Sequence, residues 1–286
     1  MVGPLAPPAP AGRRRRLLPF SPWHLVLMPL ALLFATPLVQ MLLTSLKTNA
    51  EIRQIPPSIL PRDPSMRGFA RLFAESDVLR WLLNSVIVAS ASVLAQVVLC
   101  SLAGYGFARM RFAGRTVAFV TLMATLMIPI QLLMIPTYVM FSRMGIVNTL
   151  PALIVPWLSS AFGIFLMRQF FLSIPQELEE AARLDGCSAF SVFWRVVFPL
   201  ARPALATLAI FALLGSWNDL IWPLIAVNDE SWFTLQRGLV EFHGTRRTEW
   251  QMLMAGNVVA TPPLIVFFLL AQKQFIATMT FSGLKG

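Results

Sequence analysis

The stretch LLNSVIVASASVLAQVVLCSLAGYG at residues 82–106 contains no charged residue. A helix rises 1.5 Å per residue, so about 20 apolar residues are enough to cross the roughly 30 Å hydrocarbon core of a bilayer. An apolar run of this length is therefore predicted to be a transmembrane helix, so the protein is expected to fold in a lipid bilayer.

Five more apolar stretches of comparable length follow the same rule. Across 286 residues, 57% are hydrophobic and 13% are charged, whereas soluble domains contain about 25% charged residues. The sequence therefore predicts an all-α polytopic membrane protein whose six-helix transmembrane domain covers residues 21–286. The other spans are expected at Trp23–Leu46, Val117–Phe141, Leu150–Met167, Pro203–Val227 and Met252–Ala271.

Prolines lie inside the third, fourth and sixth predicted spans. Membrane helices tolerate proline where neighbouring groups satisfy the freed carbonyls, and the helix then bends. We expect simple kinks, rather than hinges, at Pro129, Pro136, Pro156 and the pair Pro262-Pro263.

The amino terminus is rich in Pro, Ala and Gly and ends in Arg13–Arg16. Such a composition cannot bury a core, so residues 1–20 are predicted to be a disordered basic tail. The apolar run that follows is too long for a signal-peptide core and lacks a small-x-small cleavage site, so it is expected to remain as the first span. Arginines directly before a first span favour the cytoplasm, which places both termini there if there are six spans.

Several functional classes find little support in the residues. Lys and Arg are scattered between apolar spans despite a net charge of +10, which disfavours nucleic-acid binding. Cys100 and Cys187 lack metal or disulfide spacing and are expected to be free thiols. His24 and His243 have no ligand partner at metal spacing, so no metal site is expected. The phosphate-binding pattern G-x-x-x-x-G-K-[ST] does not occur, so the chain is not expected to bind ATP by itself.

The most specific pattern lies in the polar connection at about residues 168–202. Ser173-Ile174-Pro175-Gln176 resembles a capping box and predicts that a helix begins there. Acidic Glu177, Glu179 and Glu180 follow near the positive end of that helix, and Gly186 is suited to end it in a left-handed turn. A second amphipathic helix is expected from Ala189 to Val197, before Pro199 and re-entry into the membrane. From these residues alone, an interfacial linker remains an equally good interpretation.

Glu180-Ala181-Ala182, three residues, Gly186 and then Val197-Phe198-Pro199 resemble the EAA loop of binding-protein-dependent ABC importer permeases, with Phe198 in place of the usual Leu. In that family the loop forms a coupling helix that seats in the ATPase subunit. The resemblance implies a type I ABC importer permease fold with a cytoplasmic coupling helix. It assigns contact with the ATPase to Glu177, Glu180, Ala181, Ala182, Asp185, Gly186 and Pro199.

Other segments, in order, are similar to the smaller permease subunit of the maltose-type carbohydrate branch. They are Asn84-Ser85, Gly104–Arg109, Ile128-Pro129, Ile135–Tyr138, Trp217–Asp219 and Gly283–Gly286. The resemblance covers residues 20–286. It implies that the chain lies in the cytoplasmic (inner) membrane. The partners that it implies are a second, larger permease, two copies of an ATPase that bind ATP and Mg, and an extracytoplasmic solute-binding protein.

Polar residues within lipid usually face a bundle interior or a water-filled path. The most conspicuous is Asp219, whose neighbours Trp217, Asn218 and Trp222 supply the aromatic faces and acceptors that hydroxyl-rich solutes need. Interhelical contact and a position near the membrane boundary are the alternatives for Asp219. Gln131, Asn84 and Asn257 are further candidates for the substrate path.

Two other classes of function predict residues that differ from those present. A secondary transporter driven by an ion gradient predicts repeated spans and several coupled carboxylates, whereas Asp219 stands alone within the spans. A membrane enzyme predicts a nucleophile–base pair or paired carboxylates, and the spans contain neither. The chain is therefore expected not to be an enzyme, and the solute it carries stays open.

Overall fold

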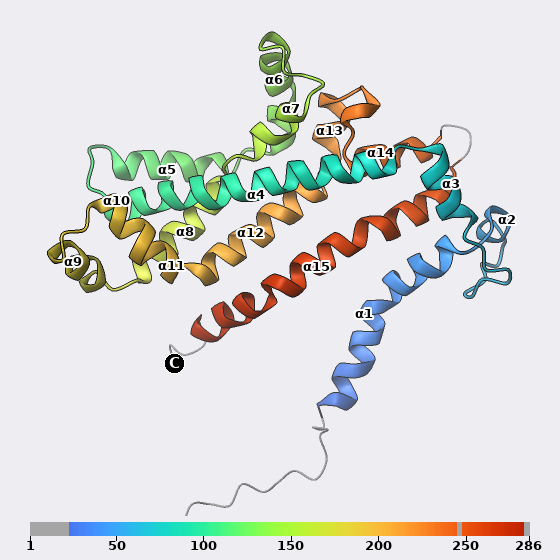
Figure 1. Ribbon diagram of the computed structural model, residues 1–286, viewed down its shortest axis with the longest axis horizontal. Coiled ribbons are helices and arrows are strands. Elements are labelled where there is room, and N and C mark those ends of the chain that lie inside the picture. The colour runs from blue at the N-terminus through green and yellow to red at the C-terminus, as the bar shows by residue number, and fades with distance from the viewer. Residues whose placement is uncertain (1–22, 245–247, 283–286) are drawn as a thin grey trace, which may run out of the picture.

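The computed structural model describes residues 23–244 and 248–282, and in that part of the chain the regular elements are helices (Figure 1). Three helices are long and apolar enough to cross a membrane unbroken: α1 (His24–Ser45), α4 (Val78–Arg109) and α15 (Trp250–Ser282). They match the first, second and sixth predicted spans. α4 and α15 are longer than predicted because each helix continues beyond the ends of its apolar run. The predicted tail, residues 1–20, and Gly283–Gly286 lie outside the described residues.

The third and fourth spans are broken rather than continuous. α5 (Arg115–Thr125) and α6 (Ile130–Arg143) meet at 100°. α7 (Leu150–Ile154) and the 3₁₀ turn η1 (Val155–Trp157) meet α8 (Ala161–Ser173) at 40°. Each break leaves a short non-helical segment within the broken span. Such backbone is tolerated in membranes where it is buried in protein or borders a water-filled cavity.

The expectation of simple proline kinks is therefore wrong for the third span. Pro129 directly precedes α6, and a proline disfavours the helical conformation of the residue before it. Pro136 lies inside α6, and Pro262 and Pro263 lie inside α15, without ending either helix. The same residue type thus lies at one helix break and is carried inside α6 and α15, as Pro29 and Pro37 are inside α1.

The fifth span is also interrupted. α12 (Arg202–Trp217) ends at Asn218, and α13 (Ile221–Ala226) begins after two further residues. The Asn218 N–H and Nδ2 both donate to the Leu214 carbonyl, at 3.2 and 2.9 Å, and so close the last turn of α12. The predicted continuous span Pro203–Val227 is corrected to two helices with Asp219 in the break.

Short elements connect these helices. Before α4 come α2 (Asn49–Ile52) and α3 (Arg67–Glu75). Between α8 and α12 lie α9 (Glu177–Leu184), α10 (Ala189–Val192), the π-helical turn η2 (Phe193–Val197) and α11 (Phe198–Leu200). Between α13 and α15 lie η3 (Glu230–Trp232), α14 (Leu235–Leu239) and η4 (Val240–Phe242). In Figure 1 the α9–α11 group and the α2, α3 and α14 group occupy opposite ends of α4.

Two clusters of buried apolar side chains hold the two ends of the molecule. One joins the first half of α4 to α7, α13, α14 and α15, and it includes Trp81, Leu153 and Leu235. The other joins the last turns of α4 to α8, η2 and α12, and it includes Phe171 and Phe193. α4 and α12 both contribute to the two clusters, α12 through Trp217 in the first and Leu208 in the second.

Gly104 lets α4 and α8 approach closely. A Cβ at this position would lie 2.8 Å from the Met167 Cβ and 2.9 Å from the Arg168 backbone nitrogen. Small residues at such crossings are a common means of packing membrane helices. Because one of the obstructing atoms belongs to the backbone of α8, the clash cannot be relieved by a change of rotamer.

Gly104→Ala is expected to destabilise the protein by about 1–3 kcal/mol through overpacking. Gly106→Ala is the matched control, because its nearest atom outside the local backbone is the Met110 Sδ at 3.9 Å. Both variants gain the same intrinsic helix propensity. Thermal unfolding in detergent should show a lower midpoint for Gly104→Ala alone, and equal midpoints would contradict the close approach of α4 and α8.

Candidate functional sites: the α9 surface and the Asp219 cavity

α9 begins at Glu177, close to its predicted start, but without the predicted capping box. Ser173 is the last residue of α8, and its hydroxyl donates to the Phe170 carbonyl at 2.7 Å. Gln176 precedes α9 in a helical conformation, with no side-chain cap. The prediction failed because the serine hydroxyl was already used inside the preceding helix.

The predicted turn after α9 is confirmed. Gly186 has φ +83°, a left-handed conformation that L side chains rarely adopt. The Cys187 N–H donates back to the Ala182 carbonyl at 3.0 Å, and the Ser188 hydroxyl accepts from Ser191 N–H at the start of α10. The second amphipathic helix predicted from Ala189 to Val197 is present as α10 and η2.

Most residues that the resemblance assigns to the ATPase contact lie on the surface of this turn. Exposed members are Glu177, Glu180, Ala181, Asp185 and Gly186, whereas Ala182 and Pro199 are partly buried. Two large apolar side chains beside them, Leu184 and Phe190, are 89% and 68% exposed. The sequence did not assign either of them to the ATPase contact. We name Glu180, Leu184 and Phe190 the α9 surface.

Glu179 differs from its acidic neighbours because it points into the protein. Its side chain is 3% exposed and accepts from Arg109 Nε at 2.6 Å and from the Tyr105 hydroxyl at 2.9 Å. Both partners come from the last turns of α4. The sequence places them about 70 residues away, so the pattern of three glutamates gave no sign that one of them is buried.

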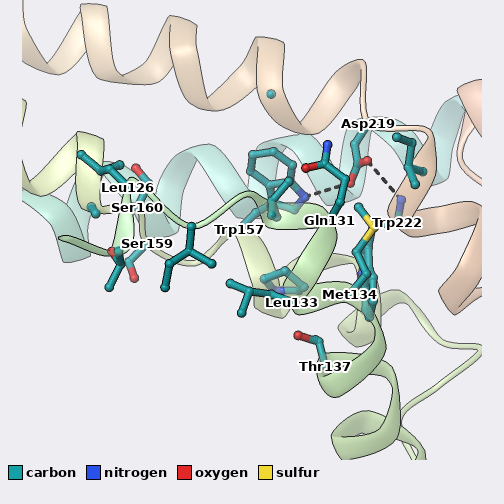
Figure 2. A pocket seen from close by; sticks show the side chains of 17 residues that line it. Leu126, Gln131, Leu133, Met134, Thr137, Trp157, Ser159, Ser160, Asp219 and Trp222 are labelled. Atoms are coloured by element: carbon teal, nitrogen blue, oxygen red, sulfur yellow. Dashed lines mark hydrogen bonds between the residues drawn. The ribbon is translucent and has the colours of Figure 1, made fainter. Parts of the chain in front are cut away.

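A cavity of about 500 Å³ lies where the three broken spans meet. Figure 2 shows its lining, which comes from the α5–α6 break, from η1 and the start of α8, and from the α12–α13 break. The polar side chains on its wall are Thr125, Gln131, Thr137, Ser159, Ser160 and Asp219, together with Trp157 and Trp222.

Asp219 joins two of the broken spans at this cavity. One carboxylate oxygen accepts from Trp157 Nε1 at 3.3 Å, and the other accepts from the Trp222 backbone N–H at 3.4 Å (Figure 2). The Trp222 indole in turn donates to the Ala152 carbonyl at 2.9 Å. The carboxylate thus both borders the cavity and holds its wall together.

Only part of the predicted substrate path gathers here. The structure brings Asp219, Trp222 and Gln131 together and adds Trp157 and Ser160, which sequence reasoning missed. The cue for them was Pro156, which marks the point where an apolar span stops being a regular helix.

The other four candidates lie elsewhere. Trp217 is buried in the first apolar cluster and Asn218 is exposed. Asn84 Nδ2 donates to the Ser231 and Phe233 carbonyls at 3.0 and 2.9 Å, and Asn257 Nδ2 donates to the Leu253 carbonyl of its own helix at 2.8 Å. Asn84 is therefore an interhelical bracket in this structure, and Asn257 closes a local bond.

In the part of the chain that the structure describes, no group of three His, Cys, Asp or Glu side chains is placed to hold a metal ion.

The family model described as "Binding-protein-dependent transport system inner membrane component" matches residues 96–280. The chain therefore belongs to this family. It is the membrane-spanning permease subunit of an ATP-binding-cassette importer, and it works with a solute-binding protein, a second permease and ATPase subunits. The family is a transport family rather than an enzyme class, and it disfavours the ion-gradient alternative.

Individual relatives cover almost the whole chain. The Arabinooligosaccharides transport system permease protein AraQ of Bacillus subtilis is 32% identical over 92% of this chain and 94% of its own length. The Diacetylchitobiose uptake system permease protein NgcG of Streptomyces coelicolor is 28% identical, with 95% and 90% covered. The sn-glycerol-3-phosphate transport system permease protein UgpE of Yersinia pestis is also 28% identical, with 88% and 93% covered.

A solved structure shares the fold. A chain of a bacterial ABC transporter involved in the import of the acidic polysaccharide alginate superposes with a TM-score of 0.76, at 24% identity, over 88% of this chain and 94% of that chain. The type I importer permease fold predicted from the EAA resemblance is thereby confirmed.

Proposed function

We propose that this permease imports a sugar or sugar-like solute and that the α9 surface seats on the ATPase. The three named relatives carry arabino-oligosaccharides, diacetylchitobiose and glycerol phosphate according to their names. Their shared chemistry is a ligand rich in hydroxyl groups, which favours a solute of that class here. ATP and Mg act on the partner subunits, and this chain carries out no catalysis.

The observation that carries the ATPase contact is the exposure of Leu184 and Phe190 beside acidic Glu180. Large apolar side chains ringed by polar groups are typical of surfaces that bind a protein partner. α9 is joined through a tight turn to α10 and lies at one end of the molecule (Figure 1). This end is accordingly the cytoplasmic one. α15 runs from the opposite end toward it, and α1 begins away from the α2 and α3 end, so we assign both termini to the cytoplasm (Figure 1).

The cavity at Asp219 is the part of this chain that we assign to the solute path. Its wall combines indole rings with amide, hydroxyl and carboxylate groups, and ligand sites commonly combine an apolar wall with a few polar groups that fix orientation. Solute held there would contact both the α5–α6 break and the α12–α13 break.

Leu184→Glu tests the ATPase contact with little risk to the fold, since the side chain is 89% exposed. We expect the variant to co-purify with the second permease but to lose the ATPase, because truncating or charging a contact of this kind typically weakens binding by about thirtyfold. Leu60→Glu is the matched control: Leu60 is 66% exposed at the opposite end.

Quantitative immunoblotting of the purified complex is the measurement. Equal ATPase retention by Leu184→Glu and Leu60→Glu would contradict the assigned surface. A wild-type chain that purifies with no ATPase, and takes up solute without ATP, would contradict the importer itself.

A further inference from the structure

α9 is tied to the membrane helices by a buried ionic contact with α4. The Arg109 and Glu179 side chains are 6% and 3% exposed, and their Nε and Oε1 atoms lie 2.6 Å apart. Arg109 Nη2 also donates to the Ile174 carbonyl at 2.5 Å, and the Tyr105 hydroxyl donates to the other Glu179 oxygen at 2.9 Å. We name Arg109, Tyr105 and Glu179 the coupling joint.

The coupling joint is packed among buried aromatic side chains. The Tyr105 ring packs edge-on against Phe171 with centroids 5.9 Å apart, and it lies 5.1 Å from the Phe193 ring. Phe171 belongs to α8 and Phe193 to η2. The carboxylate of Glu179 meets the Tyr105 hydroxyl and the Arg109 guanidinium of α4, and Arg183 Nη2 of its own helix lies 3.6 Å from it.

Polar contacts along α4 then reach the cavity. Gln96 Oε1 accepts from the Ser160 hydroxyl at 3.0 Å, and Cys100 Sγ accepts from the Ser160 N–H at 3.4 Å. Ser160 caps α8 at the break after η1 and lines the cavity. α4 is thus bonded to the residue at which the fourth span bends.

The far end of α4 is bonded just as firmly to the opposite end of the molecule. Asn84 Nδ2 donates to the Ser231 and Phe233 carbonyls, and the Ser85 hydroxyl accepts from the Leu235 N–H at 2.7 Å. α4 is one unbroken helix of 32 residues, whereas α5–α6, α7–α8 and α12–α13 are broken. A continuous helix transmits displacement along its length, while broken ones absorb it.

A brace that only stabilises the fold is the competing explanation. A buried ion pair is weak evidence for stability, because desolvation offsets much of the attraction, and in some proteins a buried polar contact selects one geometry over others. The joint therefore suits control of position better than net stabilisation.

We propose that the coupling joint makes α4 follow α9, so that movement of α9 is delivered along α4 to Ser160 and the cavity. Glu179 is a positioning residue in this scheme: it contacts neither solute nor partner, whereas exposed Glu180 faces the ATPase. The inference rests on the proposed seating of the α9 surface on the ATPase.

The test compares solute uptake with ATP hydrolysis in proteoliposomes that contain the complete importer and its solute-binding protein. Glu179→Gln keeps the shape but removes the charge, and we expect uptake per ATP hydrolysed to fall about tenfold, within the usual range of coupling between distant sites. Tyr105→Phe removes one hydroxyl and keeps the ring packing, so a smaller fall of about threefold is expected. Arg109→Glu combined with Glu179→Arg should restore part of the ratio.

Arg71→Gln is the control. It removes the charge from a partly exposed ion pair away from the coupling joint, because Arg71 of α3 pairs with Glu75 and, at 3.0 Å, with Glu249 just before α15. The ratio should stay at the wild-type value. If uptake and hydrolysis fall together in Glu179→Gln and Tyr105→Phe, or if neither variant changes the ratio, the joint is only a brace and the proposal is wrong. Failure of the wild-type complex to hydrolyse ATP or retain its ATPase would instead contradict the proposed function.

Discussion

Asp219→Ala is expected to lower both the stability of the complex and solute uptake, the latter by tenfold or more. Its carboxylate accepts from the Trp157 indole and from the Trp222 N–H, and hydrogen bonds to charged groups contribute about 1.5–3 kcal/mol each. Alanine leaves both donors without this acceptor at the edge of the cavity. The helix breaks on either side of the cavity then lose the group that joins them.

Asp219→Asn distinguishes a role in the substrate path from a role in interhelical contact, the alternatives that the sequence left open for Asp219. Asparagine keeps one carbonyl oxygen that can accept from one of the two donors, while its NH2 group faces the other, so the thermal midpoint should fall less than that of Asp219→Ala. Solute hydroxyls donate more strongly to a carboxylate than to a neutral amide, by about a factor of two in energy. We therefore expect uptake by Asp219→Asn to fall about tenfold even though the fold is kept.

Uptake of radiolabelled solute and thermal unfolding of the same preparations are the measurements. Asn218→Ala is the control, since Asn218 is exposed and its Nδ2 donates to Leu214 in its own helix; uptake should change little. Wild-type uptake by Asp219→Asn would show that Asp219 serves only as an interhelical bracket.

The features that the sequence predicts well are those written in neighbouring residues. Apolar length predicts α1, α4 and α15, because crossing a bilayer requires a minimum number of residues whatever they pack against. Gly186 predicts its turn because glycine can adopt the left-handed conformation that the turn requires, whatever its neighbours are. The EAA pattern likewise spans few positions, and it led to the correct fold.

The features that it predicts poorly depend on partners distant along the chain. Glu179 is buried against Tyr105 and Arg109, which lie 74 and 70 positions away along the chain. Asn84 is satisfied by carbonyls 147 and 149 positions away, so the expectation that a polar residue in a span faces a path did not apply to it. Pro129 lies at a break, whereas Pro136, Pro262 and Pro263 lie inside helices, so a proline in the sequence does not by itself predict where a span breaks.

Gly238→Ala is expected to be the most destabilising single-methyl change in the described chain. A Cβ at Gly238 would overlap Cε3 and Cδ2 of the Trp81 indole. Trp81 is 1% exposed in the first apolar cluster, and its ring lies 6.4 Å from Phe233 and 6.0 Å from Phe242. Overpacking of a filled core costs about 1–3 kcal/mol and sometimes more, and a fully buried indole has little room to move.

The consequence extends beyond local packing because α14 and η3 are the elements that hold the far end of α4. Displacement of α14 strains the bonds from Leu235 to Ser85 and from Asn84 to Phe233, so Gly238→Ala should lower the thermal midpoint more than Gly104→Ala does. Adding Trp81→Leu opens the space that the methyl needs and should recover part of the loss, which a defect confined to helix α14 would not allow. An unchanged midpoint for Gly238→Ala, measured beside Gly106→Ala, would mean that α14 does not lie against the Trp81 ring and that this anchor of α4 is misplaced.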